Sequence, residues 1–279
     1  MNVTGIEVND LGVVECLWQH LLTTFGPQKL STIVTLIYLF VVYIGTSLPY
    51  ALIYKYKPAF LYKYKIQDEA KTEKLKKIQP TDWKCIKQLL INHFVVLIPS
   101  AIGIYPALRY VNADFGLPLP SWTDTIVRIF LYFVIEDTFF YWGHRFFHTK
   151  WGYNNVHYLH HQYQAPIAMA SSYAHLAEFI VLGTGFALGP AIIGINHLFT
   201  LWVWIFVRQV EALDCHCGFD FPWHLSKFLP FYCGPHHHDH HHKTYGGNFA
   251  STFTWWDWMM GTDKKYREDC QKEAKKKVN

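Results

Sequence analysis

The sequence contains few charged residues. Asp, Glu, Lys and Arg make up 16% of its 279 residues, whereas soluble globular domains carry roughly 25%. Hydrophobic residues reach 51% and aromatic residues 18%. This composition argues against an ordinary soluble domain and favours a membrane protein. The net charge of +4 is too small to indicate nucleic-acid binding, and a surface that faces anionic lipid headgroups accounts for it.

Several common sequence markers are also missing. We find no internal repeat, no low-complexity linker and no N-terminal basic-then-apolar signal with a cleavage site. The six cysteines are scattered, and one residue separates Cys215 from Cys217 rather than the two of a structural zinc knuckle. The cysteines therefore indicate a reduced, cytosol-facing environment, and the length suits one or two domains.

Long apolar runs are what the sequence does contain. Residues 31–54 carry no charge over 24 positions, and about 20 residues suffice to cross a bilayer. Four further apolar runs follow, the last two forming a hairpin: 89–108, 125–144, 176–193 and 195–213. We therefore expect an all-α integral membrane protein, a bundle of roughly four to five transmembrane or re-entrant helices. How many of them span the membrane fully stays open.

Charge asymmetry orients this bundle. Residues 55–87 hold ten lysines, whereas residues 110–124 hold no lysine or arginine, so the first segment is expected in the cytoplasm. The histidine-rich segments then also fall on the cytoplasmic side, as a helical cap. The expected divisions are an N-terminal segment, a membrane segment, a basic cytoplasmic loop, a domain with the remaining membrane helices and a basic tail, at residues 1–30, 31–54, 55–87, 88–266 and 267–279.

Fifteen of the 17 histidines lie between residues 144 and 242, and their spacing is regular. Eight recur at i, i+3 or i, i+4, which places imidazoles on one helix face where they can share a metal: His144, His148, His157, His160, His161, His238, His241 and His242. Eight ligands are too many for one tetrahedral ion and suit two, although imidazole alone does not distinguish iron, copper and zinc. His20, His93, His197 and His224 are expected to be structural, His236 and His240 to be non-ligands, and His237 is undecided.

The three groups, HRFFH, HYLHH and HDHHH, resemble the histidine boxes of the fatty acid hydroxylase superfamily, which are membrane di-iron oxygenases of lipids. From about residue 83 to 266 the chain is most similar to the methylsterol monooxygenases. The resemblance implies oxidation of a sterol 4-methyl group by two irons and dioxygen. It also implies electrons from NAD(P)H through a separate cytochrome b5 and its reductase, and an endoplasmic reticulum location. It adds His175 and His216 as further metal ligands, and it implies that residues 88–266 are a catalytic domain of the fatty acid hydroxylase type.

Carboxylates are expected beside the histidines, because metal-bound histidines commonly donate their second ring N–H to one. Asp137 precedes His144 by seven residues and shares its helix face, and Asp239 lies inside the last box. We expect both to support the metal site. A sterol must arrive from the bilayer, so we also expect an apolar pocket lined by 125–143 and 176–213, with Trp202, Trp204 and Phe206 as possible lining residues.

Other functions stay open at this point. The same chemistry could act on a fatty acyl chain, an alkylglycerol or a sterol side chain, and a non-catalytic membrane protein could use the histidines to bind metal. Lys276 and Lys277 stand fourth and third from the end, which resembles a dilysine retrieval signal of endoplasmic reticulum membrane proteins. The substrate, its regiochemistry and the oligomeric state are not indicated.

Overall fold

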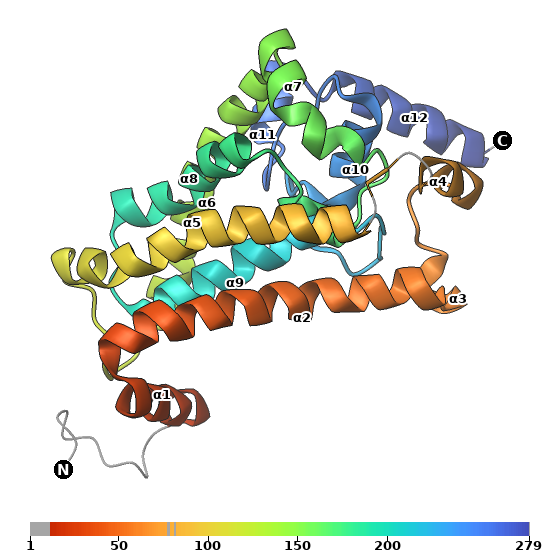
Figure 1. The fold of residues 1–279 in the computed structure, drawn as a ribbon. Coiled ribbons are helices and arrows are strands. Elements are labelled where there is room, and N and C mark those ends of the chain that lie inside the picture. Colours follow the sequence, from red (N-terminus) through yellow and green to blue (C-terminus); the bar gives the residue numbers. More distant parts are fainter. Residues whose placement is uncertain (1–11, 77–78, 81, 279) are drawn as a thin grey trace.

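The computed structural model describes residues 12–76, 79–80 and 82–278, so part of the expected segment 1–30 lies outside it. Within these ranges the chain forms helices and three isolated bridges, but no sheet (Figure 1). The α-helices are α1 (Val13–Lys29), α2 (Thr35–Tyr56), α3 (Ala59–Tyr62), α4 (Glu69–Lys76), α5 (Asp82–Tyr110), α6 (Trp122–Phe147), α7 (Lys150–Asn155), α8 (Leu176–Ile193), α9 (Leu198–Cys215), α10 (Gly234–Thr244), α11 (Trp255–Met260) and α12 (Lys264–Val278).

Among the residues that the structure describes, three stretches are long and apolar enough to cross a membrane: Val13–Tyr56, Asp82–Tyr110 and Leu176–Ile193. Helices α6 and α9 complete the bundle expected from the sequence. The first stretch is longer than the expected 31–54, because α1 continues into α2 through a π-helical turn, Leu30–Val34. Gly26 bends it with φ 71° and ψ 164°, a conformation that glycine adopts readily. The all-helical membrane fold is confirmed.

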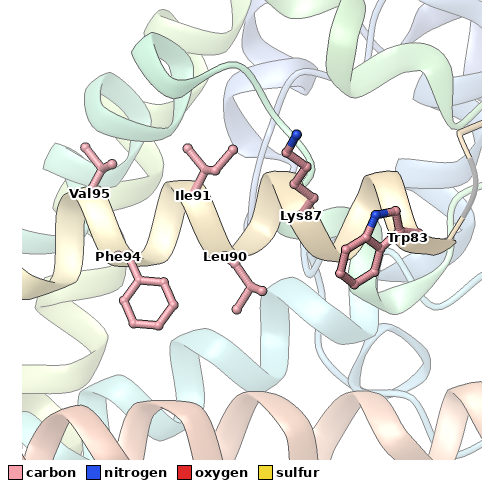
Figure 2. A pocket seen from close by; sticks show the side chains of 6 residues that line it. All are labelled: Trp83, Lys87, Leu90, Ile91, Phe94 and Val95. Atoms are coloured by element: carbon pink, nitrogen blue, oxygen red, sulfur yellow. The ribbon is translucent and has the colours of Figure 1, made fainter.

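The outward face of α5 shows how the bundle meets lipid. Figure 2 shows Leu90, Ile91, Phe94 and Val95 along this face, with Trp83 and Lys87 at its start. The four apolar side chains are 37–49% exposed. An exposed apolar stripe is costly in water and stable in hydrocarbon, and Trp and Lys are typical of the membrane interface. This face therefore suits a lipid environment.

Helices α6 and α8 pack closely because α8 carries a glycine at the crossing. A Cβ atom at Gly189 would lie 2.6 Å from the Cα atom of Tyr132, so a larger residue would force the helices apart. Tyr132 also donates a hydrogen bond to the carbonyl of Gly194 (2.6 Å) at the turn after α8. This packing fixes α6, and with it the histidines at its C-terminal end.

The short helices form a cap at one end of the bundle. Figure 1 shows α4, α10 and α12 at this end, while α1 lies at the opposite one. The basic loop joins the cap through backbone hydrogen bonds, from Ile66 N to Gly218 O and from Asp220 N to Tyr64 O. The expected domain boundary at residues 87/88 falls inside α5, which already begins at Asp82.

Candidate metal centre

The first histidine pair lies where α6 ends. His144 occupies the last turn, and His148 is the residue at which the helix stops. His144 is 1% exposed, so the polar ring is held inside the protein. The sequence GHRFFH therefore places two imidazoles one helical turn apart at the boundary between the bundle and the cap.

The second box differs from the α-helix expected from its spacing. His157–Gln162 forms a 3₁₀-helix, which has a tighter turn than an α-helix. The third box lies on α10, as its spacing predicts. In both boxes, adjacent histidines point to different sides.

The structure gathers nine histidines into two groups. In each group, every histidine offers one ring nitrogen, and these nitrogens all lie within 4.8 Å of one another. The first group comprises His144, His148, His157, His161 and His241, and the second comprises His160, His216, His238 and His242. The second and third boxes each contribute to both groups. His216, which the resemblance alone suggested, lies in the second group.

Within the groups the Nε2 atoms face each other. The Nε2 atoms of His144 and His157 are 3.1 Å apart, and the Nε2 atoms of His241 and His161 are also 3.1 Å apart. In the second group the corresponding distance from His238 to His216 is 2.9 Å. Two nitrogen ligands on one tetrahedral ion, each about 2.0–2.1 Å from it, lie roughly 3.3 Å apart. The spacing therefore fits shared coordination.

The hydrogen-bond partner of Nδ1, the other ring nitrogen, shows which tautomer is present. Nδ1 of His144 lies 2.8 Å from Phe249 O, that of His216 lies 2.8 Å from Ala212 O, and that of His241 lies 2.6 Å from Gly247 O. A carbonyl accepts only, so each Nδ1 must carry the proton. Each Nε2 then presents a lone pair to its neighbours, an arrangement that a cation stabilises. The donor set therefore fits bound metal.

Burial keeps these rings neutral. It lowers the pKa of His160 to about 4 and the pKa of His216 to about 3. It also lowers the pKa of His157 to about 3. Neutral imidazole is the form that binds metal, so the cap holds these side chains ready for coordination at neutral pH.

Three residues expected at the site, His175, Asp137 and Asp239, lie elsewhere. His175 is exposed and its Nδ1 accepts a hydrogen bond from Ala177 N at the start of α8 (3.2 Å), so we leave it out of the ligand set. Asp137 accepts hydrogen bonds from Thr252 N and Phe253 N (2.8 and 3.0 Å). Both ring nitrogens of His144 face other partners, Phe249 O and Nε2 of His157, so Asp137 does not support this ring directly.

Asp239 does not contact the histidine groups either. Its carboxylate accepts from Gln67 Nε2 (3.0 and 3.1 Å), because it projects from another face of α10 than His238 and His242. The non-ligand expectation for His236 and His240 is consistent with their position outside both groups. His237, undecided from the sequence, faces Cys233, with 3.1 Å between Nδ1 and Sγ.

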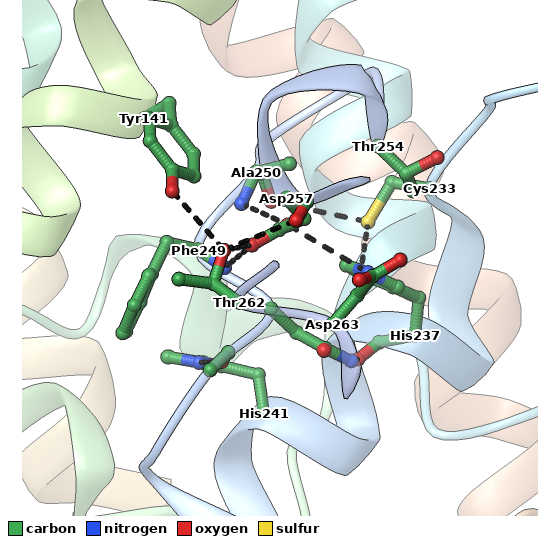
Figure 3. A network of polar contacts seen from close by, with 12 residues as sticks. Tyr141, Cys233, His237, His241, Phe249, Ala250, Thr254, Asp257, Thr262 and Asp263 are labelled. Carbon is green, nitrogen blue, oxygen red and sulfur yellow. Dashed lines mark hydrogen bonds and ion pairs between the residues drawn. The ribbon is translucent and has the colours of Figure 1, made fainter. Parts of the chain in front are cut away.

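Two carboxylates that the sequence did not single out support the site. Glu178 accepts from Nδ1 of His157 (2.8 Å). Asp257 accepts from the backbone N–H groups of Phe249 and Ala250, both at 2.9 Å (Figure 3). Asp257 thereby fixes the backbone whose carbonyls orient His144 and His241. Asp257 lies far in sequence from every histidine box, so no spacing pointed to it. Glu178 is an acid at the start of an apolar run, and nothing in the sequence linked it to His157.

A cavity opens onto the histidines. Its volume is about 460 Å³, and it is lined by α2, α5, α6, α8 and α9. His144, His157 and His160 line one part, and residues of α2 and the π-helical turn before it, from Tyr43 back to Ser31, line another. Twelve residues of helix span about 18 Å, so the cavity suits an elongated apolar molecule. Trp202, Trp204 and Phe206 do not line it, because Trp202 stacks on Tyr38 and Trp204 on Phe186.

Comparison with known proteins agrees with this geometry. The fatty acid hydroxylase family model matches residues 129–262. Methylsterol monooxygenase 2-2 of Arabidopsis thaliana is 44% identical over 257 residues, which cover 91% of this chain and 93% of that protein. The chain belongs to the fatty acid hydroxylase family. It is thus an oxidoreductase that acts on lipids.

Other relatives of this fatty acid hydroxylase family member carry two kinds of name. Methylsterol monooxygenase 2-1 of Arabidopsis thaliana is 41% identical, with 92% of this chain and 96% of that protein covered. Very-long-chain aldehyde decarbonylase GL1-11 of Oryza sativa subsp. indica is 40% identical, with 91% and 93% covered. No solved structure matches significantly. Family membership and the histidine groups together indicate a metal-binding membrane protein.

Proposed function

We propose that this protein is a di-iron monooxygenase that oxidises the 4-methyl group of sterols. Dioxygen would be the co-substrate, and electrons would come from NAD(P)H through cytochrome b5 and its reductase. The observation that carries this proposal is the cavity of about 460 Å³ that joins an apolar bundle to two histidine groups. The relatives named methylsterol monooxygenase, up to 44% identical, support the sterol assignment.

The nine grouped histidines are the proposed ligands of the two irons, one ion per group. When bound, the irons would supply the reductive activation of dioxygen that an inert C–H bond requires. The protein's own residues hold the site in shape. Glu178 supports His157, and Phe249 O and Gly247 O orient His144 and His241.

A buried charge cluster lies beside the histidines and also lines the cavity. Arg208 pairs with Glu136 (2.8 Å) and with Glu211 (2.6 Å). With both carboxylates ionised, this cluster carries a net negative charge, which would help to offset two divalent ions held by neutral imidazoles. The apolar remainder of the cavity would bind the sterol rings and exclude water from the reacting carbon.

We place the protein in the endoplasmic reticulum membrane with the cap and the C-terminus in the cytoplasm. The ten lysines of residues 55–87 support this orientation. An antibody against a C-terminal tag should label cells whose plasma membrane alone has been permeabilised. Labelling that requires permeabilised internal membranes would contradict the orientation.

Conversion of a long-chain aldehyde is the second candidate, because the rice relative named very-long-chain aldehyde decarbonylase is 40% identical. The two functions differ in substrate shape and can be separated by assay. Membranes that contain this chain are supplied with NADPH and either 4-methyl and 4,4-dimethyl sterols or a long-chain aldehyde. We expect oxidation of the sterols and no hydrocarbon product. Hydrocarbon formation without sterol oxidation would favour the alternative.

A matched pair of variants links this activity to the histidine groups. His241 belongs to the first group, whereas the adjacent His240 points toward Asp269 on α12 (3.3 Å). His241→Ala should abolish sterol oxidation and lower the bound iron to at most one ion per chain, whereas His240→Ala should keep the activity and both ions. Full activity in His241→Ala would refute the assignment.

A further inference from the structure

A third cluster of ligand-type side chains lies outside both histidine groups. Asp214, Cys217 and His224 present a carboxylate oxygen, a sulfur and a ring nitrogen, all within 4.8 Å of one another. The chain folds back after α9 to bring them together. Cys217 N donates to Asp214 O (3.0 Å), and His224 N donates to Phe221 O (3.2 Å).

His224 is the unusual member of this cluster. Its side chain is 5% exposed, yet neither ring nitrogen makes a hydrogen bond. Nε2 lies 3.3 Å from Asp214 Oδ1, so the polar edge of the ring is directed into the cluster. Leaving a buried polar atom unsatisfied costs about 1–3 kcal/mol. A ligand bound by this ring would remove that cost.

The surrounding charges favour a cation. Tyr50 donates to Asp214 Oδ1 (2.5 Å), and Lys227 pairs with Asp220 (2.7 Å). The carboxylate of Asp220 interacts electrostatically with all three members of the cluster. Its Oδ1 is buried and makes no hydrogen bond. Two carboxylates and a thiol thus lie near an imidazole that makes no hydrogen bond, and only one of these carboxylates pairs with a lysine.

We propose that Asp214, Cys217 and His224 bind a zinc ion that is separate from the two histidine groups. Sulfur, imidazole nitrogen and carboxylate oxygen form a typical tetrahedral zinc set with one position left for water or a further ligand. Magnesium and calcium prefer oxygen alone. The ion would tie the end of α9 to the turn at 217–224, and so fix His216, which lies between two of its ligands.

Cobalt substitution tests this proposal, since a thiolate bound to Co²⁺ gives a near-ultraviolet charge-transfer band that an all-histidine site lacks. The full chain in detergent micelles is loaded with Co²⁺, and its spectrum and cobalt content are measured. We expect the band in the wild type and in Cys85→Ser, which removes another buried thiol. Cys217→Ser and His224→Gln should each lose the band and about one equivalent of cobalt.

The test also separates this site from the proposed oxygenase centre. His241→Ala should keep the band, because the thiolate lies outside the first histidine group. Absence of the band from the wild type would overturn the proposal, whatever the variants do. A band that persists in both Cys217→Ser and His224→Gln would overturn it as well. If Cys217→Ser fails to fold, His224→Gln, which keeps the thiol, decides.

Discussion

At the scale of the residue, the site depends on which nitrogen of each imidazole carries the proton. Carbonyl or carboxylate acceptors face Nδ1 of His144, His157, His160, His216 and His241. The lone pairs on Nε2 are thereby directed inward before any ion arrives. Such pre-orientation lowers the cost of assembling a metal site, since the rings need not change tautomer or rotate.

Removing the charge of Glu178 should weaken the first group. In Glu178→Gln the amide oxygen still accepts from His157 Nδ1, but the negative charge that increases ring basicity is gone. We expect metal affinity to fall about 10-fold or more, within the range known for such partners. Competition with a chelator measures the change. Glu268→Gln, on the exposed surface of α12, is the control, and equal affinities in both variants would contradict this role.

Acid should destabilise the metal-free protein. Burial lowers the pKa values of His157, His160 and His216 to between about 3 and 4, whereas unfolded histidine titrates near 6.5. The unfolded state therefore binds more protons below pH 6.5, and stability falls as the pH drops toward the folded values. Each such histidine contributes about 1.4 kcal/mol per pH unit.

Buried carboxylates act in the opposite direction, since burial raises the pKa of Asp239 to about 6 and also raises the pKa of Asp257. The buried histidines of the two groups outnumber these carboxylates. Thermal unfolding of the metal-free protein at pH 7.5 and pH 5 measures the net effect. We expect a lower midpoint at pH 5. An equal or higher midpoint at pH 5 would show that these rings are not held neutral by burial.

At the scale of the element, helix ends and helix crossings place the ligands. The C-terminus of α6, a 3₁₀-helix and α10 supply the three boxes, and the end of α9 supplies His216. None of these elements carries a complete group. The site therefore depends on the packing of α6 against α8 and of α9 against α10.

Gly189→Ala should loosen this packing. The added Cβ would meet the backbone of Tyr132 at 2.6 Å, and such overpacking costs about 1–3 kcal/mol. Gly183→Ala in the same helix is the matched control, because nothing lies within 4 Å of its Cβ position. Thermal unfolding should show a lower midpoint for Gly189→Ala but not for Gly183→Ala. Equal midpoints would mean that the crossing is not tightly packed.

The sequence predicted the elements better than the contacts between them. Apolar runs located α2, α5, α6, α8 and α9, since burial in lipid imposes length and composition. Local spacing located the eight box histidines as a set. It failed for Asp137 and Asp239, because a shared helix face does not say which carboxylate reaches a ring. Asp257 acts through backbone N–H groups, which leave no pattern in the side-chain sequence.

At the scale of the whole molecule, an apolar bundle ends in a polar cap, and the cavity connects them. Exposed apolar side chains on α5 face outward, while the buried histidines close the cavity at the cap. Under the proposed function, the lipid would enter from the bilayer and electrons would arrive at the cap from the aqueous side. This division explains how one small protein can act on a molecule that hardly dissolves in water.

The central claim is that the two histidine groups hold one ion each. Native mass spectrometry of the iron-loaded protein, released from detergent micelles, counts these ions directly. We predict two irons per wild-type chain and at most one when His238→Ala and His242→Ala are combined, since both belong to the second group. A wild-type chain that binds no iron, or a double variant that keeps both ions, would contradict the account.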